Sequence, residues 1–133
     1  MNDPQRPRRR VVVLTGRRPP AELRAVRALV LEDPNPETSY LDQEELTDRK
    51  EEYEAGDFSF VGVRIEAEVT IDATTQVLRS PGLWGIESDA DEEEIDRIIA
   101  DEWEALRSVL KTVGVPTSQL PLAPEREWIE WRT

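Results

Sequence analysis

The side chains best suited to catalysis or to binding a charged ligand form a dense run of carboxylates in the second half of this 133-residue chain. Carboxylates at such density can hold a divalent cation, serve as an acid and a base, or present phosphate-like charge to a DNA-binding protein. The candidate acidic interaction surface comprises Asp89, Asp91, Glu92, Glu93, Asp96, Asp101 and Glu104.

A calcium loop of the EF-hand type is the sharpest metal-binding hypothesis for this run. Asp89, Asp91 and Glu93 have the first three ligand spacings of such a loop. Glu94, however, stands where the loop needs glycine, and Ala100 stands where it needs a bidentate glutamate. The spacing therefore favours a capped, solvated helix start over a calcium site, with phosphate mimicry as the functional alternative.

A second pair of carboxylates, Glu66 and Glu68, alternates along a predicted strand and shares its polar face with Arg64. Two carboxylates on one face are the minimum for acid and base catalysis. No second element of such a site is visible in the sequence. We therefore expect a cross-strand ion pair here, with Arg79 as the partner.

The chain contains neither cysteine nor histidine. Their absence excludes disulfides, thiolate metal sites and a Ser–His–Asp triad. The segment Thr15-Gly16-Arg17-Arg18 lacks the second glycine and the lysine of a phosphate-binding loop. We therefore expect a protein that is not an enzyme and holds no cofactor or metal. The alternative is a hydrolase or nuclease that uses carboxylates and a divalent metal.

Charge is distributed unevenly along the sequence. Residues 1–27 hold eight arginines against two acids, a net +6, whereas residues 28–133 hold nine basic residues against 27 acids, a net −18. An acidic body of this kind repels nucleic acid and membranes and suits a partner protein with a basic surface, while the N-terminal arginines allow weak nucleic-acid contact. No apolar run approaches the roughly 18 residues of a membrane span, and we expect a cytoplasmic protein.

Hydrophobic periodicity predicts an α+β fold with a small, twisted antiparallel sheet of three strands and one long helix. The strands are expected at about 26–31, 58–71 and 75–80, and the helix at 91–113. Ser88 or Asp89 is expected to cap that helix. The two faces expected to meet in the core carry Val63, Ile65, Ala67 and Val69 from the sheet, and Ile95, Ile99, Trp103, Leu106 and Leu110 from the helix.

Three local features leave alternatives open. Residues 21–32 fit either a helix or a strand, with a strand favoured by their β-branched content. Phe58 and Phe60 are out of phase with the strand that follows, which predicts either a bulge near Gly62 or burial of both faces. Trp84, between the sheet and the long helix, is expected to fill the core under the helix, the alternative being a stacking platform for a ligand.

The domain organisation predicted from composition has three parts. Residues 1–10 read as a disordered basic arm, 11–116 as a single α+β domain, and 117–133 as a proline-interrupted tail. Within the domain, 10–15 is a candidate strand and 42–55 a short surface helix. The tail anchor, Trp128, Ile129 and Trp131, is expected to dock on the sheet, within the molecule or across a homo-oligomer, or else to bind another chain.

Two stretches, GDFSFVGVRIEAEV (56–69) and SPGLWGIESDADEEEI (80–95), carry a family resemblance. They resemble uncharacterised small acidic proteins of actinobacterial phages and mobile elements, which share a GLWGIESD motif. The resemblance implies a phage or mobile-element origin and a shared fold, and it transfers no catalytic residues. The expected function is that of an accessory protein that binds a host or phage protein, in its most concrete form a DNA mimic that inhibits a nucleic-acid enzyme. A structural virion component is the alternative.

Overall fold

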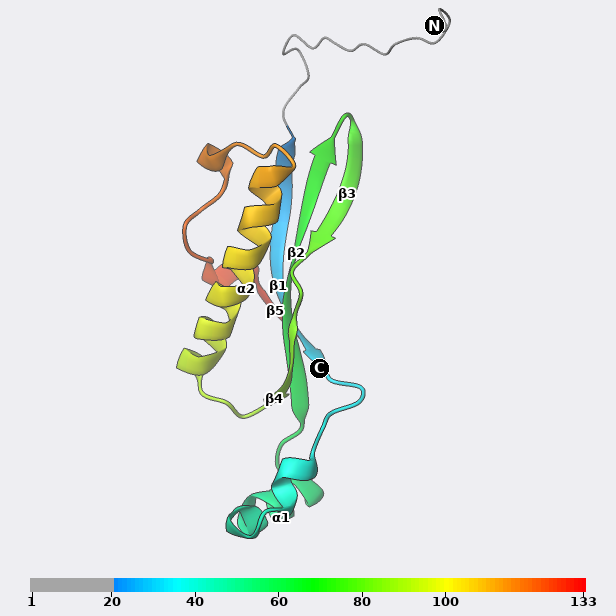
Figure 1. Cartoon of the computed structure of the whole chain (residues 1–133), viewed down its shortest axis with the longest axis vertical. Helices are drawn as coiled ribbons and strands as arrows, with labels where there is room; N and C mark the ends of the chain where they lie inside the picture. The colour runs from blue at the N-terminus through cyan, green and yellow to red at the C-terminus, as the bar shows by residue number, and fades with distance from the viewer. Residues whose placement is uncertain (1–20) are drawn as a thin grey trace, which may run out of the picture.

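The computed structural model describes residues 21–133, so the predicted arm (1–10) and the candidate strand at 10–15 lie outside the described residues. The strands are β1 (Glu22–Glu32), β2 (Phe60–Ile71), β3 (Thr74–Arg79), β4 (Leu83–Glu87) and β5 (Ile129–Arg132) (Figure 1). The helices are α1 (Thr47–Glu54) and α2 (Glu92–Thr112), with 3-10 turns η1 (Ser39–Asp42), η2 (Glu44–Leu46), η3 (Thr117–Gln119) and η4 (Arg126–Trp128).

The sheet is mixed, with strand order β3-β2-β1-β5 and β4 paired to β2. The α+β class is confirmed, and the ambiguous segment 21–32 is a strand. The three predicted strands are present as β1, β2 and β3 and pair antiparallel, but the expected strand count and the all-antiparallel sheet are wrong, because β5 runs parallel to β1 and β4 adds a further short strand. Strands of four and five residues are too short to show an alternation, and a parallel pairing between distant segments leaves no local signal.

β3 and β4 form one interrupted edge strand along β2. β3 pairs with Glu66–Ile71, and β4 pairs with the start of β2, from Phe60 to Val63. The break falls at the buried residue Ser80, whose Oγ accepts a hydrogen bond from the Ile65 N–H at 2.9 Å while its own N–H donates to the Ile65 carbonyl at 2.9 Å. Ser80 therefore bridges the break with a side-chain acceptor.

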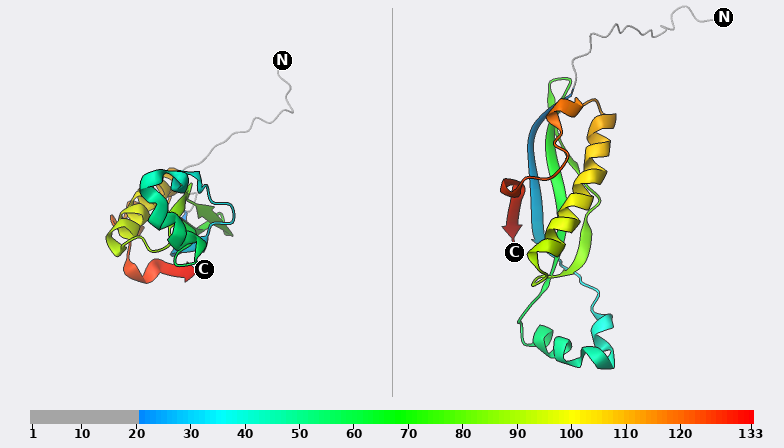
Figure 2. Two further views of the ribbon diagram at one scale, coloured as in Figure 1. Left: turned by 90° about the horizontal axis from the view of Figure 1, so that it is seen from below. Right: turned by 90° about the vertical axis from the view of Figure 1, so that its left-hand side faces the viewer.

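The predicted core is confirmed, with α2 packed along one face of the sheet (Figures 1 and 2). Trp103 lies at the centre of this core and is 1% exposed, and its Nε1–H donates to the Pro121 carbonyl at 2.9 Å. The helix cap differs from the prediction, because Asp91 rather than Ser88 or Asp89 accepts the Glu94 N–H, at 2.8 Å. The two earlier residues are engaged elsewhere.

The C-terminal segment docks within the molecule. Trp128 packs against Trp103 with ring centroids 4.9 Å apart, and Ile129 joins the core at the start of β5. Trp131 stays 53% exposed. Two of the three tail-anchor residues thus pack on the core of the same chain, and the third, Trp131, leaves about half of its surface open.

The β2–β3 hairpin turns on Asp72 and Ala73, which both have positive φ, 50° and 66°. Such a two-residue turn matches the twist of the flanking strands, but the left-handed conformation costs an L-residue about 1–2 kcal/mol. We expect Ala73→Gly to raise the free energy of unfolding by about 0.5–1 kcal/mol, after the larger unfolded-state entropy of glycine is subtracted. Denaturant unfolding measures this.

The matched control is Ala105→Gly, the same chemical change on the exposed surface of α2. It should lower stability by about 1 kcal/mol, because a helix interior disfavours glycine. Equal effects at the two positions would contradict the strained turn.

Trp103→Ala should lower the free energy of unfolding by about 3–5 kcal/mol, because it empties the centre of the core. Trp131→Ala is the comparison, as it removes the same side chain from a half-exposed site and should cost clearly less. Thermal melts of both variants test the packing, and a Trp103→Ala melt like that of the wild type would refute it.

Candidate functional site

Residues 33–57 form a small lobe, here called the acidic lobe, that extends beyond the sheet between the end of β1 and the start of β2 (Figure 1). It contains η1, η2 and α1 and lies at the opposite end of the sheet from the start of β1. The sheet hydrogen bonding ends where the Asp33 N–H donates to the Phe60 carbonyl at 2.9 Å. Within the lobe, the helix predicted at 42–55 is present in a shorter form, as α1, and 3-10 turns precede it.

An aromatic cluster separate from the main core attaches the acidic lobe to β2. Leu41, Phe58 and Phe60 are buried in it, and Tyr40 and Tyr53 pack around them. The Tyr53 and Phe60 rings meet edge-on with centroids 5.2 Å apart. Both faces of β2 are thus covered at its start, and the β2–β4 register also shifts at this end. Burial of both faces therefore accounts for the out-of-phase phenylalanines, because β2 pairs with β1 in unbroken register through Gly62 and the extra residue of the register shift lies in β4.

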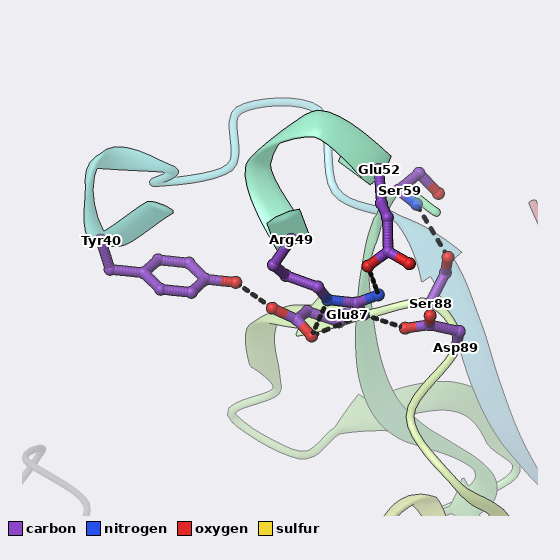
Figure 3. Close-up of polar contacts among 7 residues, drawn as sticks. All are labelled: Tyr40, Arg49, Glu52, Ser59, Glu87, Ser88 and Asp89. Atoms are coloured by element: carbon purple, nitrogen blue, oxygen red, sulfur yellow. Dashed lines mark hydrogen bonds and ion pairs between the residues drawn. The ribbon is translucent and has the colours of Figure 1, made fainter. Parts of the chain in front are cut away.

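Arg49 on α1 is the electrostatic link between the acidic lobe and the end of β4 (Figure 3). Its guanidinium donates to Glu87 at 2.7 Å, to Glu52 at 3.1 Å, and to Asp89. The same group lies over the Phe58 ring, 3.6 Å from the centroid. Hydrogen bonds to Asp89 and Glu87 raise the pKa of Arg49 further above its usual range, and the Arg49 hydrogen bond lowers the pKa of Asp89.

Tyr40 and Ser88 complete this link. The Tyr40 hydroxyl donates to Glu87, and burial together with that hydrogen bond raises the pKa of Tyr40 to about 12. Ser88 and Ser59 exchange two hydrogen bonds of 2.8 Å, one through the Ser88 Oγ and one through its N–H. Glu87, Ser88 and Asp89 are therefore used to fasten the acidic lobe (Figure 3), which is why they do not cap α2.

Trp84 does not fill the core under α2, contrary to the sequence expectation. Its ring lies directly over Gly62, where an added Cβ would come within 2.0 Å of it, and 41% of Trp84 is exposed. Gly62 alternates with Val61 and Val63, so Trp84 occupies the sheet face opposite α2. Gly85, with φ +77°, separates Trp84 from Ile86, which does enter the core. This left-handed glycine interrupts the alternation of β4, so Trp84 and Ile86 face opposite sides of the sheet although they are two residues apart.

The structure does not bring the predicted acidic surface together as one set of free charges. Asp89 pairs with Arg49, and Asp91 caps α2. Arg126 forms ion pairs with Glu92 at 3.0 Å and with Asp96 at 2.8 Å. Arg97 lies 4.0 Å from Asp101. Glu93 and Glu104 are exposed and pair with no cation within 21–133.

The densest uncompensated charge lies instead on the acidic lobe. Residues 33–57 contain ten Asp or Glu against Arg49 and Lys50, a net −8. Lys50 pairs with Asp42 at 2.7 Å, and Arg49 is occupied as described. Six exposed carboxylates have no ion-pair partner among the described residues: Glu44, Glu45, Asp48, Glu51, Glu54 and Asp57. The charge density of 42–57 was readable in the sequence, but the prediction treated it as an ordinary surface helix.

The second carboxylate pair is part of an ion network on the sheet face opposite α2. Glu66 is 8% exposed and contacts Arg79 at 2.9 Å, Arg64 at 3.1 Å and Arg27 at 3.8 Å. Arg27 also pairs with Glu68. Burial raises the pKa of Glu66, but the arginines outweigh it and leave the pKa lowered. The predicted cross-strand pair with Arg79 is confirmed.

The Tyr40–Glu87 hydrogen bond should make stability depend on alkaline pH. The folded-state pKa of about 12 lies above the unfolded value of about 10. The stabilisation is therefore complete below pH 10 and is lost as pH rises to about 12. We expect Tyr40→Phe to be less stable than the wild type at pH 8, with the difference shrinking above pH 10. Urea unfolding at several pH values measures this, and a constant difference would contradict the linkage.

Within residues 21–133, no group of three or more Asp or Glu side chains is arranged to hold a metal ion. No α-helix in this part of the chain is both long and apolar enough to cross a bilayer. Comparisons with family models, curated proteins and solved structures find no match to this chain. A function therefore has to be argued from the site itself.

Proposed function

We propose that this protein is a non-enzymatic accessory protein that binds a basic surface of a partner protein through its acidic lobe. The observation that carries the proposal is a set of six exposed carboxylates, on a lobe of net −8, that have no ion-pair partner within residues 21–133. Charges of one sign gathered on one projection produce a strong local field, which raises the rate of encounter with a positive partner.

The attachment of the lobe supports this role. The aromatic cluster and the Arg49 contacts hold α1 against the sheet, so the carboxylates are presented from a fixed backbone. A preformed surface loses less conformational entropy on binding than a flexible acidic segment would. The internal ion pairs also use the lobe's two basic residues, so neither of them compensates the outer charge.

The sequence-based hypothesis placed phosphate mimicry on α2, and the lobe is now the better-supported location. Five of the seven predicted carboxylates make contacts within the chain, whereas the six on the lobe make no ion pair among the described residues. A DNA-binding enzyme is the most concrete partner, because its binding groove is lined by cations that recognise phosphate charge. The phage or mobile-element setting implied by the family resemblance suits such an inhibitor.

A matched pair of triple variants tests the proposal. Glu44→Gln/Glu51→Gln/Glu54→Gln removes three lobe charges, and Glu93→Gln/Asp101→Asn/Glu104→Gln removes three from the exposed face of α2. A partner captured from the native host is identified and purified, and its affinity for each variant is measured by calorimetry. We expect the lobe variant to bind at least about tenfold more weakly, and the α2 variant to bind almost as the wild type does.

Wild-type binding should also weaken steeply between roughly 50 and 500 mM salt, because exposed charges are screened over that range. If only the α2 variant binds more weakly, the interface lies on the surface predicted from the sequence and not on the acidic lobe. Metal-dependent hydrolysis of nucleic acid by the purified protein would contradict the non-enzymatic role.

A further inference from the structure

Trp84 forms a fixed aromatic platform beside a hollow at the base of the acidic lobe. One side of the platform rests on Gly62, yet 41% of the residue remains exposed. The adjoining hollow has a volume of about 410 Å³ and is lined by Trp84, Asp33, Pro34, Asn35, Glu37 and Gly85. A large aromatic side chain kept open to solvent by a glycine beneath it is suited to stack on a ligand.

The two carboxylates of this hollow are oriented by backbone hydrogen bonds. The Asp33 side chain accepts the N–H groups of Asn35 and Gly85, both at 3.0 Å. Glu37 accepts the Ser39 N–H at 2.8 Å, and its hydrogen bonds to Ser39 lower its pKa. Neither carboxylate pairs with a cation within the described residues 21–133. Each keeps free lone pairs, because a carboxylate can accept about four hydrogen bonds.

An indole face next to two oriented anions is the chemistry of an arginine site. A guanidinium can stack on the indole and donate to a carboxylate at the same time, which a compact ammonium does less well. Neither of the lobe's own cations lines this hollow. The hollow therefore has the charge and the shape for a cation supplied from elsewhere.

The chain itself contains a segment of the required chemistry. Residues 1–20 hold six arginines and one acid, and they precede Ala21, just before β1. The hollow lies at the other end of β1, about 36 Å away for eleven residues of strand. Twelve extended residues, from Arg9 to Ala21, span about 40 Å. Arginines in Arg6–Arg10 can reach the hollow, whereas Arg17 and Arg18 are too close to Ala21.

We infer that the Trp84 hollow binds an arginine side chain from Arg6–Arg10 of the same molecule. The bound guanidinium stacks on Trp84 and pairs with Asp33 or Glu37. This site lies apart from the six outer carboxylates of the lobe, so the inference does not depend on the proposed function. Docking would place the basic segment at the base of the lobe.

Paramagnetic relaxation in the full-length chain tests the inference. The protein lacks cysteine, so Gln5→Cys provides a single position for a nitroxide label. We expect strong broadening of the Asn35 and Gly85 amides and of the Trp84 indole N–H, with little at Ala73 near the opposite end. An untethered arm would instead broaden residues close to Ala21, and that pattern would overturn the inference.

Charge-neutral variants test the chemistry of the site. Glu37→Gln combined with Asp33→Asn keeps hydrogen-bond acceptors but removes both charges, and should reduce the broadening at Gly85 about tenfold. Glu104→Gln, an exposed change on α2, should leave it unaltered. Unaltered broadening in the double variant, or equal broadening along all of α1, would contradict a specific arginine site.

A mixed sample distinguishes the same molecule from a second copy. Isotope-labelled protein without nitroxide is combined with unlabelled protein that carries it. Absence of broadening in this mixture supports occupation by the molecule's own segment. Broadening that appears in the mixture would assign the hollow to the segment of another copy and overturn the intramolecular assignment.

Discussion

The structure depends on β2, which every other layer of the fold contacts. β1 pairs along one edge of it, and the interrupted strand β3–β4 pairs along the other. Its odd-numbered residues from Val61 to Val69 face α2 and are at most 1% exposed. Phe60, on the opposite face, belongs to the aromatic cluster of the acidic lobe. Main core, ion network and lobe therefore share one strand, and their relative positions follow from its alternation.

Arg49 joins the acidic lobe to the rest of the molecule, as β2 joins the elements of the sheet. One guanidinium contacts α1, the end of β4 and the turn before α2, and it also covers Phe58. The surrounding carboxylates would repel one another without it, in a region already rich in negative charge. The lobe can carry a large net charge on its outer surface because its inner surface is neutralised at this single point.

The long elements with a regular hydrophobic pattern were predictable from sequence, whereas the short strands and the pairing of distant segments were not. The α2 pattern repeats over six turns, and the β2 alternation over twelve residues, so both signals exceed local noise. β5 pairs with a strand about 100 residues away, which no local pattern encodes. Trp84 lies outside the core, contrary to expectation, because the left-handed Gly85 turns it to the sheet face opposite Ile86. The candidate site was missed for a different reason: Arg49 and Arg126 neutralise carboxylates that lie 30 or more residues away in the sequence, whereas the Arg97–Asp101 pair is local.

The interruption of the β3–β4 edge has a consequence for behaviour at high concentration. An unbroken edge strand exposes a row of backbone donors and acceptors that can recruit strands from other molecules. Here Pro81 removes one donor, and Gly82 and Gly85 adopt left-handed conformations within six residues of the end of β3 at Arg79. The longest uninterrupted stretch of that edge is the six residues of β3. Gly85, which turns Trp84 to the outer face, therefore also shortens the edge that is open to strands of other molecules.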